Sequence, residues 1–142
     1  MRLLSGIHFL WSGILVFAAC QDQLQRDQIH RIYVYQEINL NDFRYNNLNI
    51  IGGYVYHEAG VRGIILYRKS MSQILAFERD CPFQPSDACA LVSVDLSGLF
   101  MIDTCCTSRF DFDGNPIAGP VQFPLLQYKT YQNQNYLIIS SD

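Results

Sequence analysis

Histidine and charge are both scarce in this sequence of 142 residues. It contains 3 histidines and 16% charged residues, whereas 49% of its residues are hydrophobic and 13% are aromatic. A chain so rich in apolar side chains is not expected to be disordered. Its 10 basic and 13 acidic residues give a net charge of −3, which excludes a strongly basic surface for nucleic acid. The length suits one domain with its own core.

The motifs of several catalytic classes are also missing. The sequence has no C-x-x-C motif, the pattern of thiol oxidoreductases and of many zinc sites. No Ser-His-Asp arrangement and no paired-carboxylate constellation can be placed, so we do not expect an enzyme. Five cysteines are present, and their odd number has to be explained.

The N-terminus has the features of an export signal. Met1 and Arg2 precede a largely apolar, uncharged run of 17 residues, and Phe17-Ala18-Ala19-Cys20 resembles the lipobox of bacterial lipoproteins. At about 1.5 Å per residue the run is ~26 Å long, short for a membrane span. We expect residues 1–19 to be removed and Cys20 to be lipidated, which would anchor the exported protein to the bacterial cell envelope. An ordinary signal peptide with an incidental cysteine is the alternative.

Removal of residues 1–19 changes both the charge and the cysteine count. The mature chain keeps 9 basic and 13 acidic residues, and residues 20–31 form a polar tether between the anchor and the domain. Export implies an oxidising compartment, in which disulfides form. An even number of cysteines remains to be paired, namely Cys81, Cys89, Cys105 and Cys106.

The pattern of residues 32–142 predicts short β-strands separated by Gly, Asn and Pro. This spacing is typical of an all-β sandwich or barrel, and no segment has a convincing amphipathic helical period. We expect strands at 32–35, 37–41, 54–56, 63–67, 74–77, 91–94, 99–102, 110–112 and 136–139.

The segment from Asp80 to Tyr128 carries a family resemblance. In order it contains Cys105-Cys106-Thr107-Ser108-Arg109-Phe110, Asp113-Gly114, Gly119-Pro120 and Pro124-Leu125. This order resembles a Rieske [2Fe–2S] domain, in which Cys-x-x-His-Gly-Ser-x-Phe leads to Asp-Gly, Gly-Pro and Pro-Leu. The resemblance extends over residues 32–142. The chain is also similar to small Rieske-like lipoproteins of Bacteroidetes. It implies an antiparallel all-β fold with two inserted cysteine loops.

The cluster ligands implied by this resemblance are degenerate. A Rieske centre uses two cysteines and two histidines. Carried over to this chain, the two cysteine positions hold Cys81 and Asp103, while the two histidine positions hold Phe83 and Cys106. Thr107 stands where the family has glycine. We therefore expect the cluster to be lost and the domain to have a structural or binding role, with an envelope protein partner that the sequence does not identify.

The resemblance also implies how the cysteines pair. Many Rieske domains have a disulfide between the two loops, and its members match Cys89 and Cys105. The two former ligand positions, Cys81 and Cys106, would then form a second bridge. Each bridge would contribute ~3 kcal/mol by restricting the unfolded chain. Four cysteines allow three pairings, among which the residues alone do not choose.

Electron transfer through a retained [2Fe–2S] cluster is the alternative function. Cys81 and Cys106 would then be ligands, with Cys89 and Cys105 as further candidates for a four-thiolate site. Zinc bound by the same four thiolates is a weaker hypothesis. An accessible Cys81–Cys106 pair could also be redox-active.

Other polar residues have simpler interpretations. Asp111, Asp113 and Asn115 could bind calcium, but their spacing around a glycine first indicates a hairpin turn. Asp103 could be a carboxylate ligand, although a surface or turn position is the expectation. His57 next to Glu58 is expected to be solvated, and Ser108 is expected to hydrogen-bond the loop backbone.

Overall fold

The computed structural model describes residues 31–142, and within them the chain folds almost entirely into β-strands. The predicted signal peptide, Cys20 and nearly all of the predicted tether lie outside the described residues. None of the helices in the described part has the length and apolar character needed to cross a membrane. The elements are β1 (Tyr35–Asn39), the 3-10 helix η1 (Phe43–Asn49), β2 (Tyr54–His57), β3 (Ile64–Ser70), β4 (Gln73–Glu78), β5 (Val92–Val94), β6 (Met101–Asp103), β7 (Arg109–Phe110), β8 (Pro116–Ala118), β9 (Gln127–Asn133) and β10 (Tyr136–Ser140).

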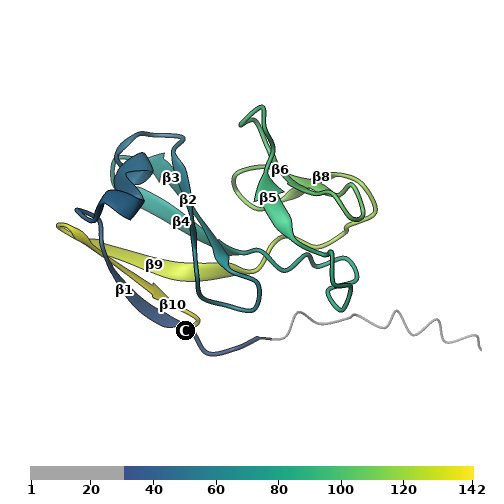
Figure 1. Cartoon of the computed structure of the whole chain (residues 1–142), viewed down its shortest axis with the longest axis horizontal. Helices are drawn as coiled ribbons and strands as arrows, with labels where there is room; N and C mark the ends of the chain where they lie inside the picture. The colour runs from purple at the N-terminus through teal and green to yellow at the C-terminus, as the bar shows by residue number, and fades with distance from the viewer. Residues whose placement is uncertain (1–30) are drawn as a thin grey trace, which may run out of the picture.

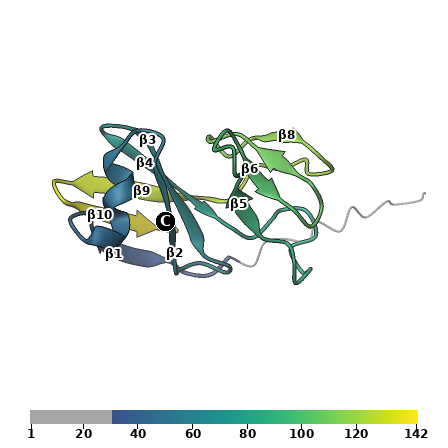
Figure 2. The ribbon, with the colours of Figure 1, turned by 45° about the horizontal axis from the view of Figure 1, so that its top comes forward.

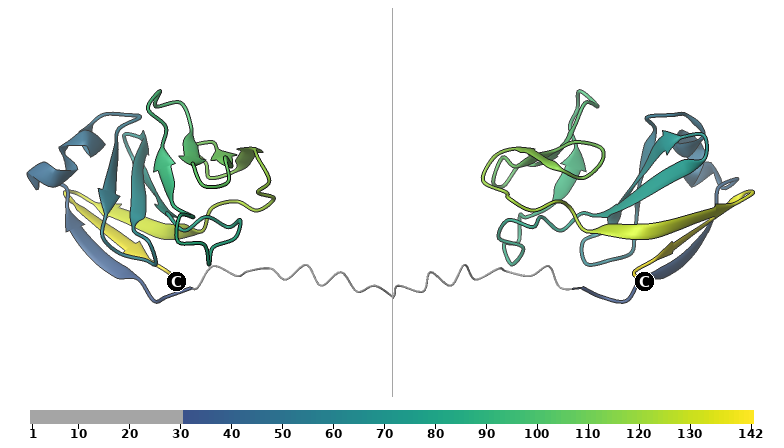
Figure 3. Two further views of the ribbon diagram at one scale, coloured as in Figure 1. Left: turned by 45° about the vertical axis from the view of Figure 1, so that its right-hand side comes forward. Right: turned by 180° about the vertical axis from the view of Figure 1, so that it is seen from behind.

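The strands form two antiparallel sheets that lie side by side (Figure 1). The large sheet has the order β1-β10-β9-β4-β3-β2, and the small sheet has the order β5-β6-β7-β8. The small sheet is inserted in sequence between β4 and β9, two neighbouring strands of the large sheet. Two further views show the large sheet curling while the small sheet stays at one end of it (Figure 3). The predicted all-β antiparallel fold is confirmed.

Strands β3 and β4 form the centre of the molecule because both of their faces are buried. Successive side chains of a strand point to opposite faces. Ile64 and Leu66 accordingly pack into the core that the large sheet curls around, whereas Ile65 packs with Leu75 and Phe77 into a second core shared with the small sheet. Continuous apolar runs, rather than alternation, are the sequence signal of such doubly covered strands.

Some predicted boundaries differ from the structure. One continuous strand runs over Tyr35–Asn39; it contains the last residue of the segment expected at 32–35 and the first three residues of the segment expected at 37–41. Residues 43–49, where no helix was expected, form η1, and Asp42 caps this helix by accepting a hydrogen bond from the Arg44 amide. The helix lies at the end of the large sheet away from the small one (Figure 2).

Glu78, at the end of β4, is a fully buried carboxylate with many donors. Its Oε1 accepts hydrogen bonds from the amides of Arg62, Arg79 and Asp80, at 2.9, 3.0 and 3.2 Å. Its Oε2 accepts from the Val61 amide at 2.8 Å and from the Tyr128 hydroxyl at 2.7 Å. A buried charge requires this degree of hydrogen bonding. Glu78 thereby joins the β2–β3 loop, β9 and the start of the inserted small sheet.

We expect Glu78→Gln to lower the free energy of unfolding by about 2–3 kcal/mol, because the amide NH₂ group would face donors instead of accepting from them. Urea denaturation followed by circular dichroism measures the change. Glu37→Gln is the matched control, since Glu37 is exposed on β1. Equal stability of the two variants would contradict the role assigned to Glu78.

Candidate functional site

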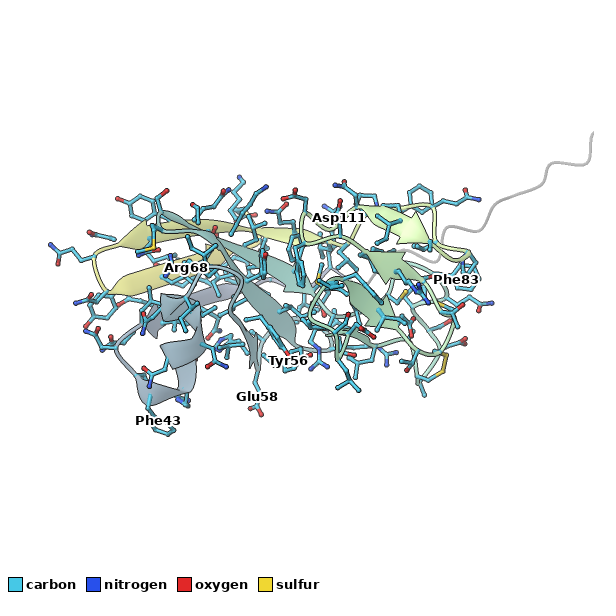
Figure 4. All side chains as sticks on the ribbon, turned by 90° about the horizontal axis from the view of Figure 1, so that it is seen from above. Phe43, Tyr56, Glu58, Arg68, Phe83 and Asp111 are labelled. Atoms are coloured by element: carbon cyan, nitrogen blue, oxygen red, sulfur yellow. A yellow bond between two sulfur atoms is a disulfide. The ribbon has the colours of Figure 1, made fainter. Side chains whose placement is uncertain are left out.

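The first cysteine loop, residues 81–90, leads from the large sheet to the small one. Asp80 forms a β-bridge with Leu91, so the loop begins and ends at one point, and the Cys81 amide donates to the Ala90 carbonyl. Phe83, within this loop, lies at the outer end of the small sheet (Figure 4) and packs against the shared core. The loop therefore has a fixed base beside the last strand residues of β4.

Arg62 holds this loop from the β2–β3 connection. Its Nε forms an ion pair with Asp80 Oδ1 at 2.7 Å. Its Nη atoms donate to the carbonyls of Pro85 and Ala88 at 2.9 Å and of Asp87 at 2.7 Å. The planar guanidinium suits this multiple donation. Sequence reasoning missed Arg62, since an isolated arginine after a turn carries no signal of such contacts.

The second cysteine loop, residues 104–108, connects β6 and β7. Thr107 has φ 62°, a left-handed conformation that is unfavourable for a β-branched residue. Gly119 lies against this loop, and a Cβ at that position would be 2.6 Å from the Ser108 Cα. The glycine thus allows a close approach of the β8 end to the loop, and the loop holds Thr107 in a strained conformation.

A disulfide between Cys89 and Cys105 joins the two loops, as predicted. Both residues are exposed, so the bridge lies at the surface. The two loops are therefore held together by a covalent bond in addition to the strands at their bases. The disulfide also removes both cysteines from the set of free ligands.

Beneath the disulfide, the two loops and the end of β6 bring together Cys81, Asp103 and Cys106, which we call the thiol site. One donor atom from each lies within 4.8 Å of the other two. The two Sγ atoms are 4.0 Å apart, and Cys106 Sγ is 3.2 Å from Asp103 Oδ2. Cys81 and Asp103 are fully buried, and Cys106 is partly exposed.

The surroundings of the thiol site favour a protonated Cys81. Burial raises the pKa of the Cys81 thiol, and its hydrogen bond to the Asp103 carboxylate raises the pKa further. The Asp103 Oδ1 atom accepts from the Cys105 amide at 2.8 Å, which orients its Oδ2 atom toward the Cys106 sulfur. Ser108, which is also buried, places its Oγ 3.0 Å from Cys106 Sγ. Without a metal ion, this arrangement is a pair of hydrogen-bonded thiols.

The structure differs here from three sequence-based expectations. The expected second disulfide is absent from the described residues, where Cys81 and Cys106 are free thiols. Both thiols are hydrogen-bonded to Asp103. Asp103 is not a surface residue, since β6 places it on the buried face of the small sheet. Ser108, expected to bond the backbone, contacts the Cys106 sulfur.

The remaining candidates lie away from the thiol site. Asp111 Oδ1 accepts from the amides of Asp113 and Asn115, which is the geometry of the predicted turn. Asp111 lies at the edge of the molecule, between the two sheets (Figure 4). His57 is half-buried, and its Nδ1 lies 3.0 Å from the Tyr45 hydroxyl, so the expectation of a solvated His57 is wrong. Burial lowers the pKa of His57.

Comparison of the chain with protein-family models and with curated proteins finds no match.

Alkylation under native conditions tests the state of the thiols. We expect iodoacetamide to modify Cys106 without a reductant, because its side chain is partly exposed. Cys81 should react only after unfolding, since it is buried and the thiolate is the reactive form. Peptide mass spectrometry reads each site, with Cys89 and Cys105 as controls that require reduction. Failure of both Cys81 and Cys106 to react in unfolded, unreduced protein would instead show that they form a disulfide.

Proposed function

We propose that this chain is a cell-envelope lipoprotein whose Rieske-like β domain has lost its iron–sulfur cluster and has a structural or binding role. The proposal joins the predicted export signal and lipidated Cys20 to the domain of residues 32–142. The residues that meet between the two loops carry the proposal. They supply two thiols and a carboxylate, Cys81, Asp103 and Cys106, but no histidine.

These residues do not fit a Rieske [2Fe–2S] cluster. Such a cluster needs two histidines on one of its irons. His57 is the one histidine among residues 31–142; it lies in β2 of the large sheet and is hydrogen-bonded to Tyr45 of η1. Phe83, which the resemblance places at a histidine position, has an apolar side chain that packs against the shared core.

Too few free cysteines remain in the two loops for electron transfer through a four-thiolate cluster. The Cys89–Cys105 disulfide takes two of the four cysteines, so the loops keep only two thiols. A [2Fe–2S] cluster held by cysteine alone needs four. A rigid pair of loops at the end of a β domain remains suited to contact with a partner, and this is the binding role that we propose.

Iron and acid-labile sulfide analysis tests this proposal. We expect the full-length protein, purified anaerobically from its native host in detergent, to be colourless and to contain neither. It should also give no electron paramagnetic resonance signal after reduction with dithionite. Two irons and two sulfides per chain, together with a reddish-brown colour, would establish the electron-transfer function instead.

A further inference from the structure

We infer that the thiol site binds a single thiophilic divalent cation, of which zinc is the natural example. Its ligands are Cys81 Sγ, Cys106 Sγ and an Asp103 carboxylate oxygen. This inference rests on the proposed loss of the cluster, because it assigns a different ligand to the same place. Thiolate and carboxylate are both established zinc donors.

The distances between the donor atoms suit one ion. Zinc–sulfur bonds are about 2.3 Å long and zinc–oxygen bonds about 2.0 Å, so a tetrahedral site has edges of roughly 3.8 Å between two sulfurs and roughly 3.5 Å between sulfur and oxygen. The observed Sγ–Sγ separation is 4.0 Å, and the Cys106 Sγ–Asp103 Oδ2 separation is 3.2 Å. Both are within a few tenths of an ångström of these edges. The third pair, Cys81 Sγ and an Asp103 carboxylate oxygen, lies within 4.8 Å. An ion can therefore enter when the side chains adjust to bring this pair closer.

The charge at the site also favours a cation. Asp103 is fully buried, and burial of a carboxylate without a compensating charge is unfavourable. The ion pairs found in residues 31–142 involve other acids, namely Asp42, Asp80 and Asp113, so no basic side chain neutralises Asp103. Its described partners are the Cys105 amide and the two thiols. A divalent ion would supply the positive charge that the protein does not.

Each ligand has a second partner that would fix its orientation. The Phe83 amide hydrogen-bonds the Cys81 sulfur, and the Ser108 hydroxyl lies 3.0 Å from the Cys106 sulfur. Once the metal deprotonates the thiols, the Phe83 amide still donates to the Cys81 sulfur, and the Ser108 hydroxyl becomes a donor to the Cys106 thiolate. The Cys105 amide occupies Asp103 Oδ1 and leaves Oδ2 for the ion. Such outer partners typically hold metal ligands in place.

Three protein ligands leave the fourth position of a tetrahedral ion open. Closed structural zinc sites use four protein ligands, whereas sites with three keep a position for water or an incoming ligand. The opening lies toward Cys106, the one ligand that is partly exposed. The site would therefore accept a water molecule or a donor group from a binding partner there.

Titration of the full-length protein with cadmium tests the inference, because cadmium replaces zinc and gives a sulfur-to-metal charge-transfer absorption. We expect one cadmium per chain and an absorption intensity that corresponds to two thiolates. Cys106→Ser should halve this intensity at saturation. Asp103→Asn should keep the full intensity, because both thiolates remain. It should weaken the affinity for cadmium on the order of 100-fold, because loss of a direct ligand costs at least as much as loss of a residue that only orients a ligand.

Asp113→Asn is the matched control, since Asp113 is an exposed acid paired with Lys69 of β3, outside the thiol site. It should bind cadmium like the unmodified protein. Retention of the Cys89–Cys105 disulfide and of the circular dichroism spectrum shows that each variant folds. Cys106→Ser replaces a partly exposed side chain and provides the test even where Asp103→Asn does not fold.

The outcomes separate this inference from the proposed function. A colourless, iron-free protein that binds no cadmium, or a Cys106→Ser variant with undiminished intensity, would overturn the single-ion site and leave the loss of the cluster intact. Two irons and two sulfides per chain would overturn both. One cadmium per chain with the expected effects of both variants would establish the site.

Discussion

The buried carboxylate of Glu78 is the interaction on which the arrangement of the two sheets depends. It accepts four backbone amides and the Tyr128 hydroxyl, and these donors come from three separate segments of the chain. Two of the amides belong to Arg79 and Asp80, the residues that connect β4 to Cys81. Glu78, which lies three residues before Cys81, thus fixes the position of Cys81 relative to the large sheet.

The same carboxylate also positions Arg62, the residue that holds the first cysteine loop. Glu78 accepts the Arg62 amide, and the Arg62 guanidinium then reaches Asp80 and three loop carbonyls. The disulfide transmits this constraint to the second loop. As a result, the donors of the thiol site converge from the two loops and from the end of β6. Support by rigid elements is the arrangement that a metal or binding site requires.

The sequence predicted the elements whose signal is local. Apolar runs such as Ile74–Phe77 marked the doubly buried strands, and the resemblance implied the Cys89–Cys105 bridge. Strand β9 was missed because only Tyr128 is buried along the segment. Its pairing with β10 is a local hairpin, whereas its pairing with β4 joins segments that are far apart in the sequence.

The candidate site was predicted only in part. The positions of Cys81 and Cys106 followed from the resemblance, and the structure brings their sulfurs to within 4.0 Å. The burial of Asp103 was not foreseen, because in a strand of three residues nothing in the local pattern indicates which face is covered. Its carboxylate changes the chemistry of the site, since both thiols approach it as a common acceptor instead of bonding to each other.

X-ray absorption at the zinc edge tests the central claim most directly. The measurement uses the full-length protein with one equivalent of zinc and reports the atoms bound to the metal. A single-ion thiol site predicts two sulfur neighbours at about 2.3 Å and oxygen neighbours at about 2.0 Å. A shell of four sulfurs, or a shell without sulfur, would contradict it.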